Sequence, residues 1–324
     1  MTVPVLQAFS NKYPEVNLTI LSRAFFKPFF EDIPNVNFLE ADVYGKHKGF
    51  GIFKLAKEAK ELGIDAVADL HNVIRSKIIT KYLFVNGVKS ATIDKGRKEK
   101  KELTQENNKN FRQLKTTHQR YADVFTKLGF PLDLEESSAL LRKDFTQKLL
   151  NLVGFAPKKL IGIAPFAAHD SKMYPLDLMK EVISLLDKTG KYQLLLFGGG
   201  KEETSKLKSI ETEFSSAICV AGILSFTEEL TLISNLDIML SMDSGNGHLA
   251  VMYGVPVISL WGVTHPYAGF APFGQAPGNN LVADRTKYPL IPTSIYGNKF
   301  PEGYEDAIKT VLPQDVAAKI ISIL

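Results

Sequence analysis

The second half of the chain alternates short apolar runs with longer amphipathic segments. Each apolar run has the length of a strand, is apolar at nearly every position and is bounded by Gly, Pro or Asp. A run of this kind is typical of a parallel strand that is buried on both faces. The runs that predict strands in this half are residues 158–165, 192–198, 216–222, 236–242 and 255–262.

The segments between these runs have the periodicity of helices. The clearest one begins with Ser225, has Glu228 three residues later and places leucines on one face, which is the pattern of a capping box. Strands that alternate with helices predict a doubly wound α/β domain with a parallel sheet. The helices expected here are residues 174–190, 201–214 and 225–236.

The first half repeats this alternation less regularly. A helix is expected over residues 49–63, because its apolar positions form one stripe and Gly63 can cap its end. The segment from Asp94 to Arg120 is polar and basic, and no internal repeat or low-complexity tract is found. Candidate strands in this half are residues 17–23, 36–43, 65–71 and 89–94.

These patterns predict an α/β protein with two Rossmann-like domains, covering residues 1–155 and 156–324. The boundary is placed at residues 154–158, where Gly and Pro interrupt a helical pattern. Residues 313–324 predict a final helix that packs against the fold and can return to the N-terminal domain. Its expected buried stripe consists of Val316, Ile320, Ile321 and Leu324.

The composition is that of a globular protein and gives no indication of a disulfide-rich, secreted or membrane-spanning one. A chain of 324 residues with 45% hydrophobic and 23% charged residues is ordinary for a globular protein of two domains. The single cysteine, Cys219, allows no internal disulfide, and the N-terminus does not have the pattern of a signal peptide. No apolar run reaches the roughly 20 residues of a membrane-spanning helix. We expect a soluble, cytoplasmic protein. A net charge of +4 favours anionic partners only weakly, and no nucleic acid partner is expected.

The stretch MDSGNGHLAVMYG joins a buried strand to a helix and concentrates polar chemistry at the join. Ligands of open α/β sheets bind at the carboxyl ends of strands, and a helix N-terminus offers backbone donors that suit a diphosphate. Asp243, Ser244 and Gly245 lie at this position. Gly245 and Gly247 allow close approach of the backbone, and His248 can add a donor or a cation. Helix capping by Asp243 and Ser244 is the alternative, but it explains neither the glycines nor the histidine.

Two further segments place polar residues after strands of the same domain. Lys172 follows the strand at 158–165 and precedes a helix, where it could contact a phosphate or be an ordinary solvated loop lysine. The run LLLFGGGKEE leads from a strand through three glycines to Glu202. It matches neither the dinucleotide fingerprint nor the P-loop. Glu202 is a candidate acceptor for a ribose hydroxyl, or it is simply an acidic residue in a first helical turn that complements the helix dipole.

Together these segments resemble glycosyltransferase family 9, the lipopolysaccharide heptosyltransferases of the GT-B fold. The Lys-x-Trp-Pro pattern of that family corresponds to Lys-Met-Tyr-Pro at 172–175. Its Asp-Thr/Ser-Gly-x-x-His pattern corresponds to Asp-Ser-Gly-Asn-Gly-His at 243–248, and its Leu-Phe-Gly-x-Thr-x-Pro pattern to Leu-Trp-Gly-Val-Thr-His-Pro at 260–266. The spacing holds over residues 158–274, and weaker similarity in the first half includes residues 69–76.

The resemblance implies two Rossmann-like domains that face each other across a cleft, and an inverting, metal-independent transfer of a sugar. The donor would be ADP-heptose or a related nucleotide sugar, and the acceptor a lipid-linked oligosaccharide of the lipopolysaccharide core. No cofactor and no metal ion are expected, and no Asp-x-Asp metal motif is found in the sequence. The enzyme would work in the cytoplasm, with peripheral contact at the inner membrane as an additional expectation.

The resemblance also assigns roles by position. Lys172, Asp243 and His248 are the candidates for catalysis, with Lys172 facing the diphosphate and Asp243 the sugar hydroxyls. The other residues expected to bind the donor are Ser244 and Gly245 through their amides, Glu202 at the ribose, Leu224 at the adenine, and Thr264.

The first residues depart from the family pattern. Family members open with an apolar strand, Gly-Asp and then Thr-x-Pro at the start of a helix, and this sequence opens at Thr2-Val3-Pro4. The aspartate is the expected general base for the acceptor hydroxyl. We expect the reading frame upstream of Met1 to encode about 5–6 residues of strand followed by Gly-Asp. We also expect Thr2 to be the N-cap of a helix in which Pro4 lies in the first turn.

Candidates on the acceptor side are less specific. His71 and Arg75 follow the strand at 65–71, where a ligand-binding residue would lie, although a lone histidine after a strand can also be an ordinary hydrogen-bonded residue. The basic run at 95–101 could contact an anionic glycolipid or membrane headgroups, or be a solvated segment. His118 and Arg120 lie in a polar helix and are expected to be solvated.

Other functions stay open at this point. The main alternative is a protein that binds a nucleotide sugar without efficient catalysis, because the expected general base precedes the first residue. Another alternative is a different GT-B enzyme that uses a UDP-sugar.

Overall fold

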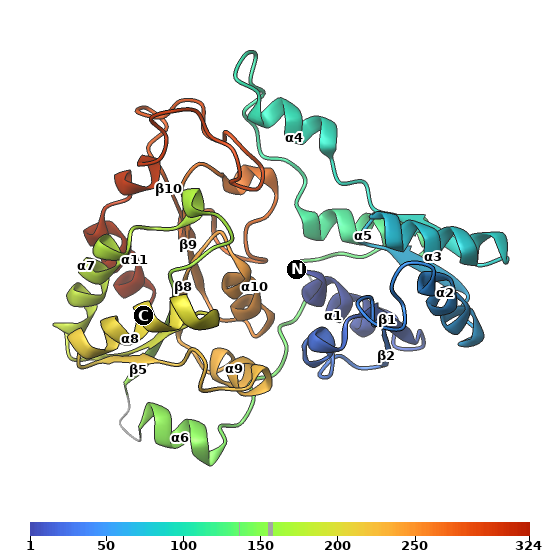
Figure 1. The fold of residues 1–324 in the computed structure, drawn as a ribbon, viewed down its shortest axis with the longest axis horizontal. Helices are drawn as coiled ribbons and strands as arrows, with labels where there is room; N and C mark the ends of the chain where they lie inside the picture. The colour runs from blue at the N-terminus through green and yellow to red at the C-terminus, as the bar shows by residue number, and fades with distance from the viewer. Residues whose placement is uncertain (136, 155–157) are drawn as a thin grey trace. The chain divides into compact units, whose positions relative to one another are not determined.

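The computed structural model describes residues 1–135, 137–154 and 158–324, and the chain divides into two compact units (Figure 1). The N-terminal unit contains residues 1–96 and 115–140, and the C-terminal unit contains residues 97–114 and 141–324. The predicted domain boundary, between residues 155 and 156, lies outside the described residues.

The C-terminal unit is built on one six-stranded parallel sheet. Its strands are β5 (Lys159–Ala164), β6 (Tyr192–Leu196), β7 (Ala217–Cys219), β8 (Ile238–Met242), β9 (Val257–Trp261) and β10 (Asn280–Val282). Its α-helices are α4 (Arg97–Thr104), α6 (Gln147–Val153), α7 (Leu176–Asp187), α8 (Gly200–Glu213), α9 (Phe226–Ile233), α10 (Gly245–Met252) and α11 (Pro313–Ile323). Short 3-10 helices are η2 (Asp170–Lys172), η3 (Pro266–Ala268), η4 (Pro277–Asn279) and η5 (Ala307–Thr310).

The strand order in this sheet is β10-β9-β8-β5-β6-β7. The chain runs outward from β5 through β6 to β7 and then returns to add β8 on the other side of β5. This reversal between β5 and β8 is the topological switch point of a doubly wound fold. Every residue of β8 and β9 is buried, as their nearly continuous apolar sequence predicts. The predicted doubly wound parallel sheet is confirmed; the short edge strand β10 was not predicted.

The last helix packs within the C-terminal unit. Val316 and Ile320 of α11 are buried in the core cluster of this unit, which also contains Met179 and Ile183 of α7. Leu324 packs against the same cluster, whereas Ile321 is exposed. The expected stripe is therefore correct except at Ile321, which lies outside the buried face.

The N-terminal unit contains two separate two-stranded parallel sheets, β1-β2 and β3-β4. Its helices are α1 (Thr2–Lys12), α2 (Gly51–Glu61), α3 (Ile74–Val85), α5 (Thr117–Leu128) and the 3-10 helix η1 (Ala24–Phe29). Its strands are β1 (Leu18–Ser22), β2 (Val36–Glu40), β3 (Ala66–Asp69) and β4 (Lys89–Thr92). The first helix begins at Thr2 with Met1 at the N-cap, so the predicted N-cap role of Thr2 is wrong.

Residues 97–114, here called the crossover segment, are encoded within the N-terminal half but belong to the C-terminal unit. Leu103 and Leu114 are buried in an apolar cluster with Ala268. The Lys100 ammonium lies 4.2 Å from the centre of the Phe270 ring, a favourable cation–π arrangement. Lys100 is therefore buried within the basic run that the sequence analysis treated as a solvated or lipid-binding segment.

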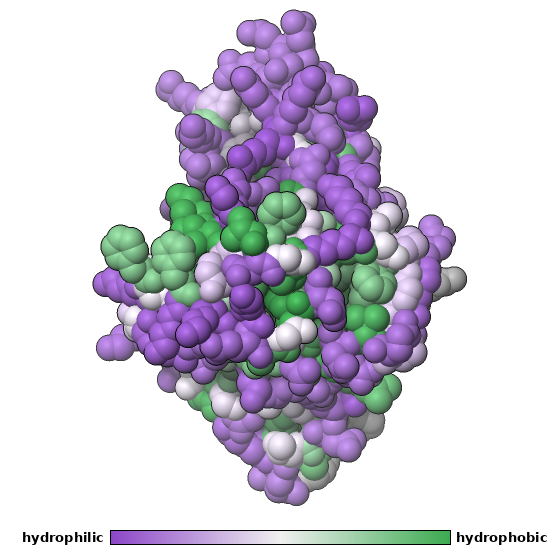
Figure 2. Space-filling view, turned by 90° about the vertical axis from the view of Figure 1, so that its right-hand side faces the viewer, coloured by the Kyte–Doolittle hydropathy of each residue, from purple (hydrophilic) through white to green (hydrophobic). Residues whose placement is uncertain are grey.

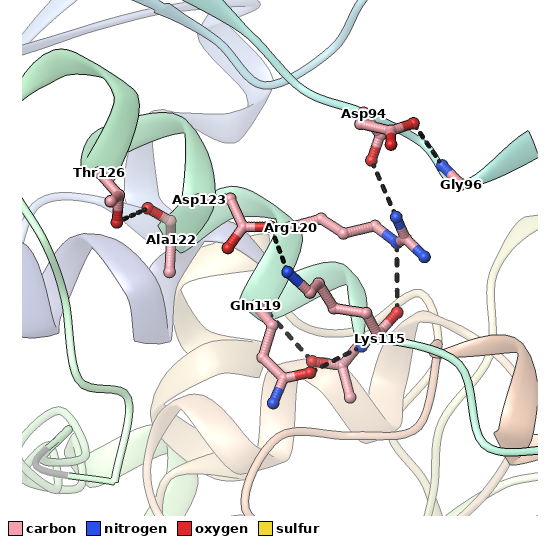
Figure 3. A network of polar contacts seen from close by, with 9 residues as sticks. Asp94, Gly96, Lys115, Gln119, Arg120, Ala122, Asp123 and Thr126 are labelled. Carbon is pink, nitrogen blue, oxygen red and sulfur yellow. Dashed lines mark hydrogen bonds and ion pairs between the residues drawn. The ribbon is translucent and has the colours of Figure 1, made fainter.

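The ends of the crossover segment are joined by Arg120 of the N-terminal unit (Figure 3). Its Nε donates a hydrogen bond to the Lys115 carbonyl at 3.2 Å, and its Nη1 donates to the Asp94 carbonyl at 3.4 Å. The chain leaves the unit after Gly96, where a Cβ atom would lie 2.3 Å from the Arg120 guanidinium. Arg120 thus fixes the positions at which the chain leaves and re-enters the N-terminal unit.

His118 and Arg120 are both buried, so the expectation that they are solvated is wrong. The amphipathic α5 turns them toward the interior of the N-terminal unit. Burial lowers the pKa of His118 to about 3, so the side chain is neutral at physiological pH. The Arg120 guanidinium donates hydrogen bonds to two backbone carbonyls of the same unit.

We predict that Arg120→Met destabilises the protein by about 1–3 kcal/mol, because it removes a buried guanidinium and both of its hydrogen bonds to backbone carbonyls. Urea denaturation followed by circular dichroism measures the change. The control is Arg97→Met, at an exposed position next to the same crossing point, for which a change within about 0.5 kcal/mol is expected. Equal stabilities of the two variants would contradict the role of Arg120.

Candidate functional site

The candidate site lies at the carboxyl edge of the six-stranded sheet, where its topology reverses. Lys172 follows β5, Asp243 directly follows β8, and Thr264 follows β9. Since β9, β8 and β5 are neighbours in a parallel sheet, these residues emerge at the same edge. The structure thus brings together residues that are far apart in the sequence.

An ion pair joins the two central residues of this edge. Lys172 Nζ lies 2.7 Å from Asp243 Oδ2, and the two side chains are only 13% and 10% exposed. The Thr264 hydroxyl donates a hydrogen bond to the same carboxylate oxygen at 3.0 Å. Two charges withdrawn from water are stabilised only when their geometry is good and further hydrogen bonds are made. The carboxylate of Asp243 is therefore engaged in the site and does not cap α10.

The N-terminus of α10 opens beside this ion pair. Ser244 is the N-cap residue in extended conformation, and its side chain makes no capping hydrogen bond. The first N–H groups of a helix have no intrahelical acceptor, and they carry partial positive charge. A Cβ atom built on Gly245 would meet no neighbouring atom within 4 Å, so the backbone is open to a ligand there.

Gly247 serves a different purpose from the one expected. A Cβ atom at Gly247 would lie 2.6 Å from Ser241 Oγ and 3.3 Å from Val257 Cγ1. These atoms belong to β8 and β9, so Gly247 allows α10 to pack closely on the sheet. The prediction that it lets the backbone approach a ligand is wrong, because the residue faces the strands.

A cavity of about 190 Å³ lies at this edge and brings four predicted residues together with three that were not predicted. Its lining consists of Lys172, Asp243, Ser244, His248, Phe270, Ile295 and Tyr296. A larger cavity of about 240 Å³ lies between α7 and α8. It contains none of the predicted site residues, and we give more weight to the smaller one, because it combines paired charges with a helix N-terminus.

The residues that were missed come from irregular segments. Phe270 follows η3, and Ile295 and Tyr296 belong to the loop 290–300, here called the wall loop. Loops carry no apolar periodicity, so the sequence gives little indication of what they contact. The available signal was Gly297, whose φ of +81° marks a sharp local turn that a glycine adopts without strain.

The wall loop holds the stem of Lys172. A Cβ atom at Gly297 would lie 2.6 Å from both Cγ and Cδ of Lys172, so the absence of a side chain makes room for the lysine. The Ser171 hydroxyl donates a hydrogen bond to the Gly297 carbonyl. From the crossover segment, Lys109 Nζ donates to the Leu290 and Pro292 carbonyls at 2.7 and 2.8 Å. Lys172 is thus positioned by a loop that is itself held from two sides.

The remaining donor-side candidates follow the other half of the sheet. Glu202 lies in the first turn of α8 after β6; it is 83% exposed and forms an ion pair with Lys206 at 2.7 Å. The hydrogen bond from Lys206 lowers the pKa of Glu202. Leu224 follows β7 and is half-buried. Neither residue lines the smaller cavity, and their predicted contacts with a nucleoside stay predictions.

The acceptor-side candidates His71 and Arg75 are exposed residues of the N-terminal unit, after β3. The buried Asp69 carboxylate at the end of β3 accepts hydrogen bonds from the backbone N–H groups of His71 and Asn72. In the described part of the chain, no three His, Cys, Asp or Glu side chains gather in a group that could hold a metal ion. Nor does any described helix have the length and hydropathy to cross a membrane.

Comparison with known protein sequences finds relatives along most of the chain. The profile described as "Glycosyltransferase family 9 (heptosyltransferase)" matches residues 52–289. The lipopolysaccharide core heptosyltransferase OpsX of Haemophilus influenzae is 24% identical over 297 residues, which are 86% of this chain and 77% of that protein.

Solved structures show the same fold. A glycosyltransferase family 9 structure from Veillonella parvula has a TM-score of 0.75 at 18% identity and covers 99% of this chain and 92% of its own. The Escherichia coli heptosyltransferase WaaC, solved with ADP, has a TM-score of 0.67 at 16% identity and covers 100% of this chain and 95% of its own. At such identities the likeness establishes the fold alone.

We predict that Gly297→Ala destabilises the protein more than Gly303→Ala does. Both positions have positive φ, of +81° and +84°, so both substitutions strain the backbone. Only the Cβ atom at position 297 meets Lys172, whereas position 303 has no neighbour within 4 Å. Overpacking of this kind costs about 1–3 kcal/mol. Thermal unfolding of both variants measures the difference; equal melting temperatures would refute the contact between the wall loop and Lys172.

Proposed function

The chain belongs to glycosyltransferase family 9 and has the GT-B fold, and we propose that it transfers heptose, or a closely related sugar, from ADP-heptose to a lipopolysaccharide core acceptor. The single observation that carries this proposal is the desolvated pair of Lys172 and Asp243 beside the N-terminus of α10. The pair combines a cation for a leaving diphosphate with an acceptor for sugar hydroxyls at one sheet edge.

The diphosphate of the donor is assigned to Lys172 and the first amides of α10. In the transfer, an acceptor oxygen forms a bond to the anomeric carbon while the bond from that carbon to the diphosphate oxygen breaks. The electron pair leaves with ADP, so negative charge grows on the diphosphate. Preorganised donors aimed at developing charge are an effective means of catalysis. Lys172 Nζ, the amides of Ser244 and Gly245, and His248 are the donors we assign to this role.

The sugar is assigned to Asp243. Its Oδ2 already binds Lys172 and Thr264, but an ionised carboxylate has about four acceptor sites. Asp243 can therefore accept hydrogen bonds from sugar hydroxyls while it keeps its contacts with Lys172 and Thr264. Glu202 and Leu224 are assigned to the ribose and the adenine, because they follow β6 and β7 at the same edge of the sheet.

Inversion at the anomeric carbon is part of the proposal. A single displacement requires a base on the acceptor side that takes the proton of the attacking hydroxyl. His71 and Arg75 are our candidates for contact with the acceptor, and we assign neither as the base. The alternative of a nucleotide-sugar-binding protein is distinguished by turnover: donor binding without any release of ADP in the presence of acceptor would favour it.

We predict that Lys172→Ala and His248→Ala each weaken binding of ADP. Loss of a hydrogen bond to a charged group costs about 1.5–3 kcal/mol, which corresponds to about a 10- to 150-fold higher Kd. Isothermal titration calorimetry with ADP measures the change, and UDP serves as the competing nucleotide. A matched control is Lys188→Ala, since Lys188 is exposed at the end of α7.

The control should bind ADP like the unmodified protein. Unchanged ADP affinity in both site variants would refute the assignment of the diphosphate to this edge of the sheet. Tighter binding of UDP than of ADP would redirect the proposal to a UDP-sugar enzyme.

We predict that the transfer does not depend on a metal ion, because the Lys172 ammonium and the hydrogen-bond donors of His248 and the backbone amides stabilise the charge at the leaving group. Release of ADP from ADP-heptose, measured after treatment with EDTA and desalting, should be unchanged. Activity that is lost on chelation and restored by a divalent cation would contradict this prediction.

A further inference from the structure

The cavity beside the ion pair is lined by side chains of two kinds, the polar residues of the site and three apolar ones. We call the second group, which consists of Phe270, Ile295 and Tyr296, the apolar wall. The centres of the Phe270 and Tyr296 rings lie 6.2 Å apart, and Ile295 packs in the same apolar cluster as Phe270. The three side chains therefore form one continuous surface, to which the proposed function has assigned no part of the substrate.

Tyr296 reaches solvent although the backbone that carries it is fixed. The buried Ser294 hydroxyl accepts hydrogen bonds from the backbone N–H groups of Tyr296 at 3.2 Å and Gly297 at 3.1 Å. The same hydroxyl donates a hydrogen bond to Asn298 Oδ1 at 2.9 Å. The Tyr296 side chain is nevertheless 61% exposed. A fixed backbone presents the ring to a ligand without the entropic cost of ordering a loop on binding.

The other two residues of the apolar wall are held by the crossover segment. Phe270 and Ile295 pack against buried leucines of this segment. The Lys100 ammonium lies on the Phe270 ring in a cation–π contact. Of the three residues of the apolar wall, only Tyr296 is exposed, so it has the most area left for contact with a ligand.

An apolar surface beside paired charges fits a sugar ring. Hydroxyl groups project from the rim of a pyranose, whereas its faces carry C–H groups. The face of an aromatic ring is the negative part of its quadrupole and attracts the weakly positive hydrogens of such groups. The Asp243 carboxylate, which accepts hydrogen bonds, lines the same cavity. The hydroxyls and the C–H face of one sugar therefore both find partners in this cavity.

The order of the strands favours the sugar over the nucleoside at the apolar wall. Glu202 and Leu224, to which the nucleoside is assigned, follow β6 and β7, whereas Phe270 follows β9 and η3. Neighbouring strands are about 4.8 Å apart, so the ends of β7 and β9 are separated by about 19 Å. A diphosphate at Lys172, which follows the intervening β5, has the nucleoside on one side and the apolar wall on the other.

We propose that the apolar wall binds the C–H face of the transferred sugar, and that Tyr296 determines how tightly this sugar is held. The inference rests on the proposed function, because it takes the ligand to be a nucleotide sugar whose diphosphate lies at Lys172. The wall loop, which carries Ile295 and Tyr296, follows the residues that match the family profile, 52–289. The family match therefore gives this loop no role, and the selection of the sugar is the role that we assign to it.

Isothermal titration calorimetry with ADP-heptose and, separately, with ADP tests the proposal, because the two ligands differ by the sugar. Tyr296→Ser should bind ADP-heptose about 5- to 10-fold more weakly, since the apolar contact of one aromatic ring is lost. The same variant should bind ADP like the unmodified protein. Tyr296→Phe keeps the ring and should bind both ligands with the affinities of the unmodified protein.

The control is Tyr44→Ser in the N-terminal unit, because exposure of an aromatic ring is not by itself the feature that matters. Tyr44 is 72% exposed and lines neither of the two cavities. Hydrophobic residues also reach the surface among hydrophilic ones on the side that lies to the right in Figure 1, as Figure 2 shows. Tyr44→Ser should bind ADP-heptose and ADP normally.

Three outcomes would overturn the proposal. Unchanged affinity of Tyr296→Ser for ADP-heptose would mean that the ring does not contact the sugar. An equal loss of affinity for ADP would assign the ring to the nucleotide instead, and an equal loss in Tyr44→Ser would mean that the effect is not specific to the cavity. Failure of the proposed function is a different result, because the unmodified protein would then bind neither ADP nor ADP-heptose. Failure of this inference alone leaves ADP binding by the unmodified protein intact.

Discussion

The ion pair between Lys172 and Asp243 is the interaction on which the architecture of the C-terminal unit converges. It links the segment after β5 to the end of β8, which are the strands on either side of the topological switch. Removing one partner from a desolvated pair typically costs about 3–5 kcal/mol, because the other charge remains buried. The ion pair therefore tolerates little change. Around it lie the wall loop, Thr264 and the N-terminus of α10.

The ion pair also determines how an anionic ligand can bind to Lys172. An anion that approaches Lys172 competes with Asp243 for the same ammonium, so binding has to divide the hydrogen bonds of Lys172 between them. The three donors of an ammonium make such sharing possible, whereas removal of Asp243 would leave Lys172 without its counter-charge. Since the stem of Lys172 fills the space beside Gly297, we expect the adjustment to fall on the terminal Nζ rather than on the whole side chain.

The sequence predicted the regular part of the fold well and the irregular part of the site poorly. The strand expected at 236–242 is Ile238–Met242 in the structure, because a continuous apolar run has few alternatives to a buried parallel strand. In contrast, α3 was not predicted, since apolar and polar residues are mixed around its circumference. Phe270 and Tyr296 escaped detection because a loop residue reveals its contacts only once the chain is folded. The burial of Arg120 was missed because its carbonyl partners are set by where the chain crosses between units.

The crossover segment ties the order of synthesis to the order of folding. Lys109 reaches carbonyl acceptors as far as Pro292, 183 residues later in the chain. At about 5–20 residues per second, the ribosome needs on the order of 10–40 s to deliver those partners. During that interval Leu103 and Leu114 lack Ala268, the apolar residue that they bury against in the finished protein. The nascent chain therefore exposes the apolar side chains of the crossover segment until the last quarter of the polypeptide has been synthesised and can pack against them.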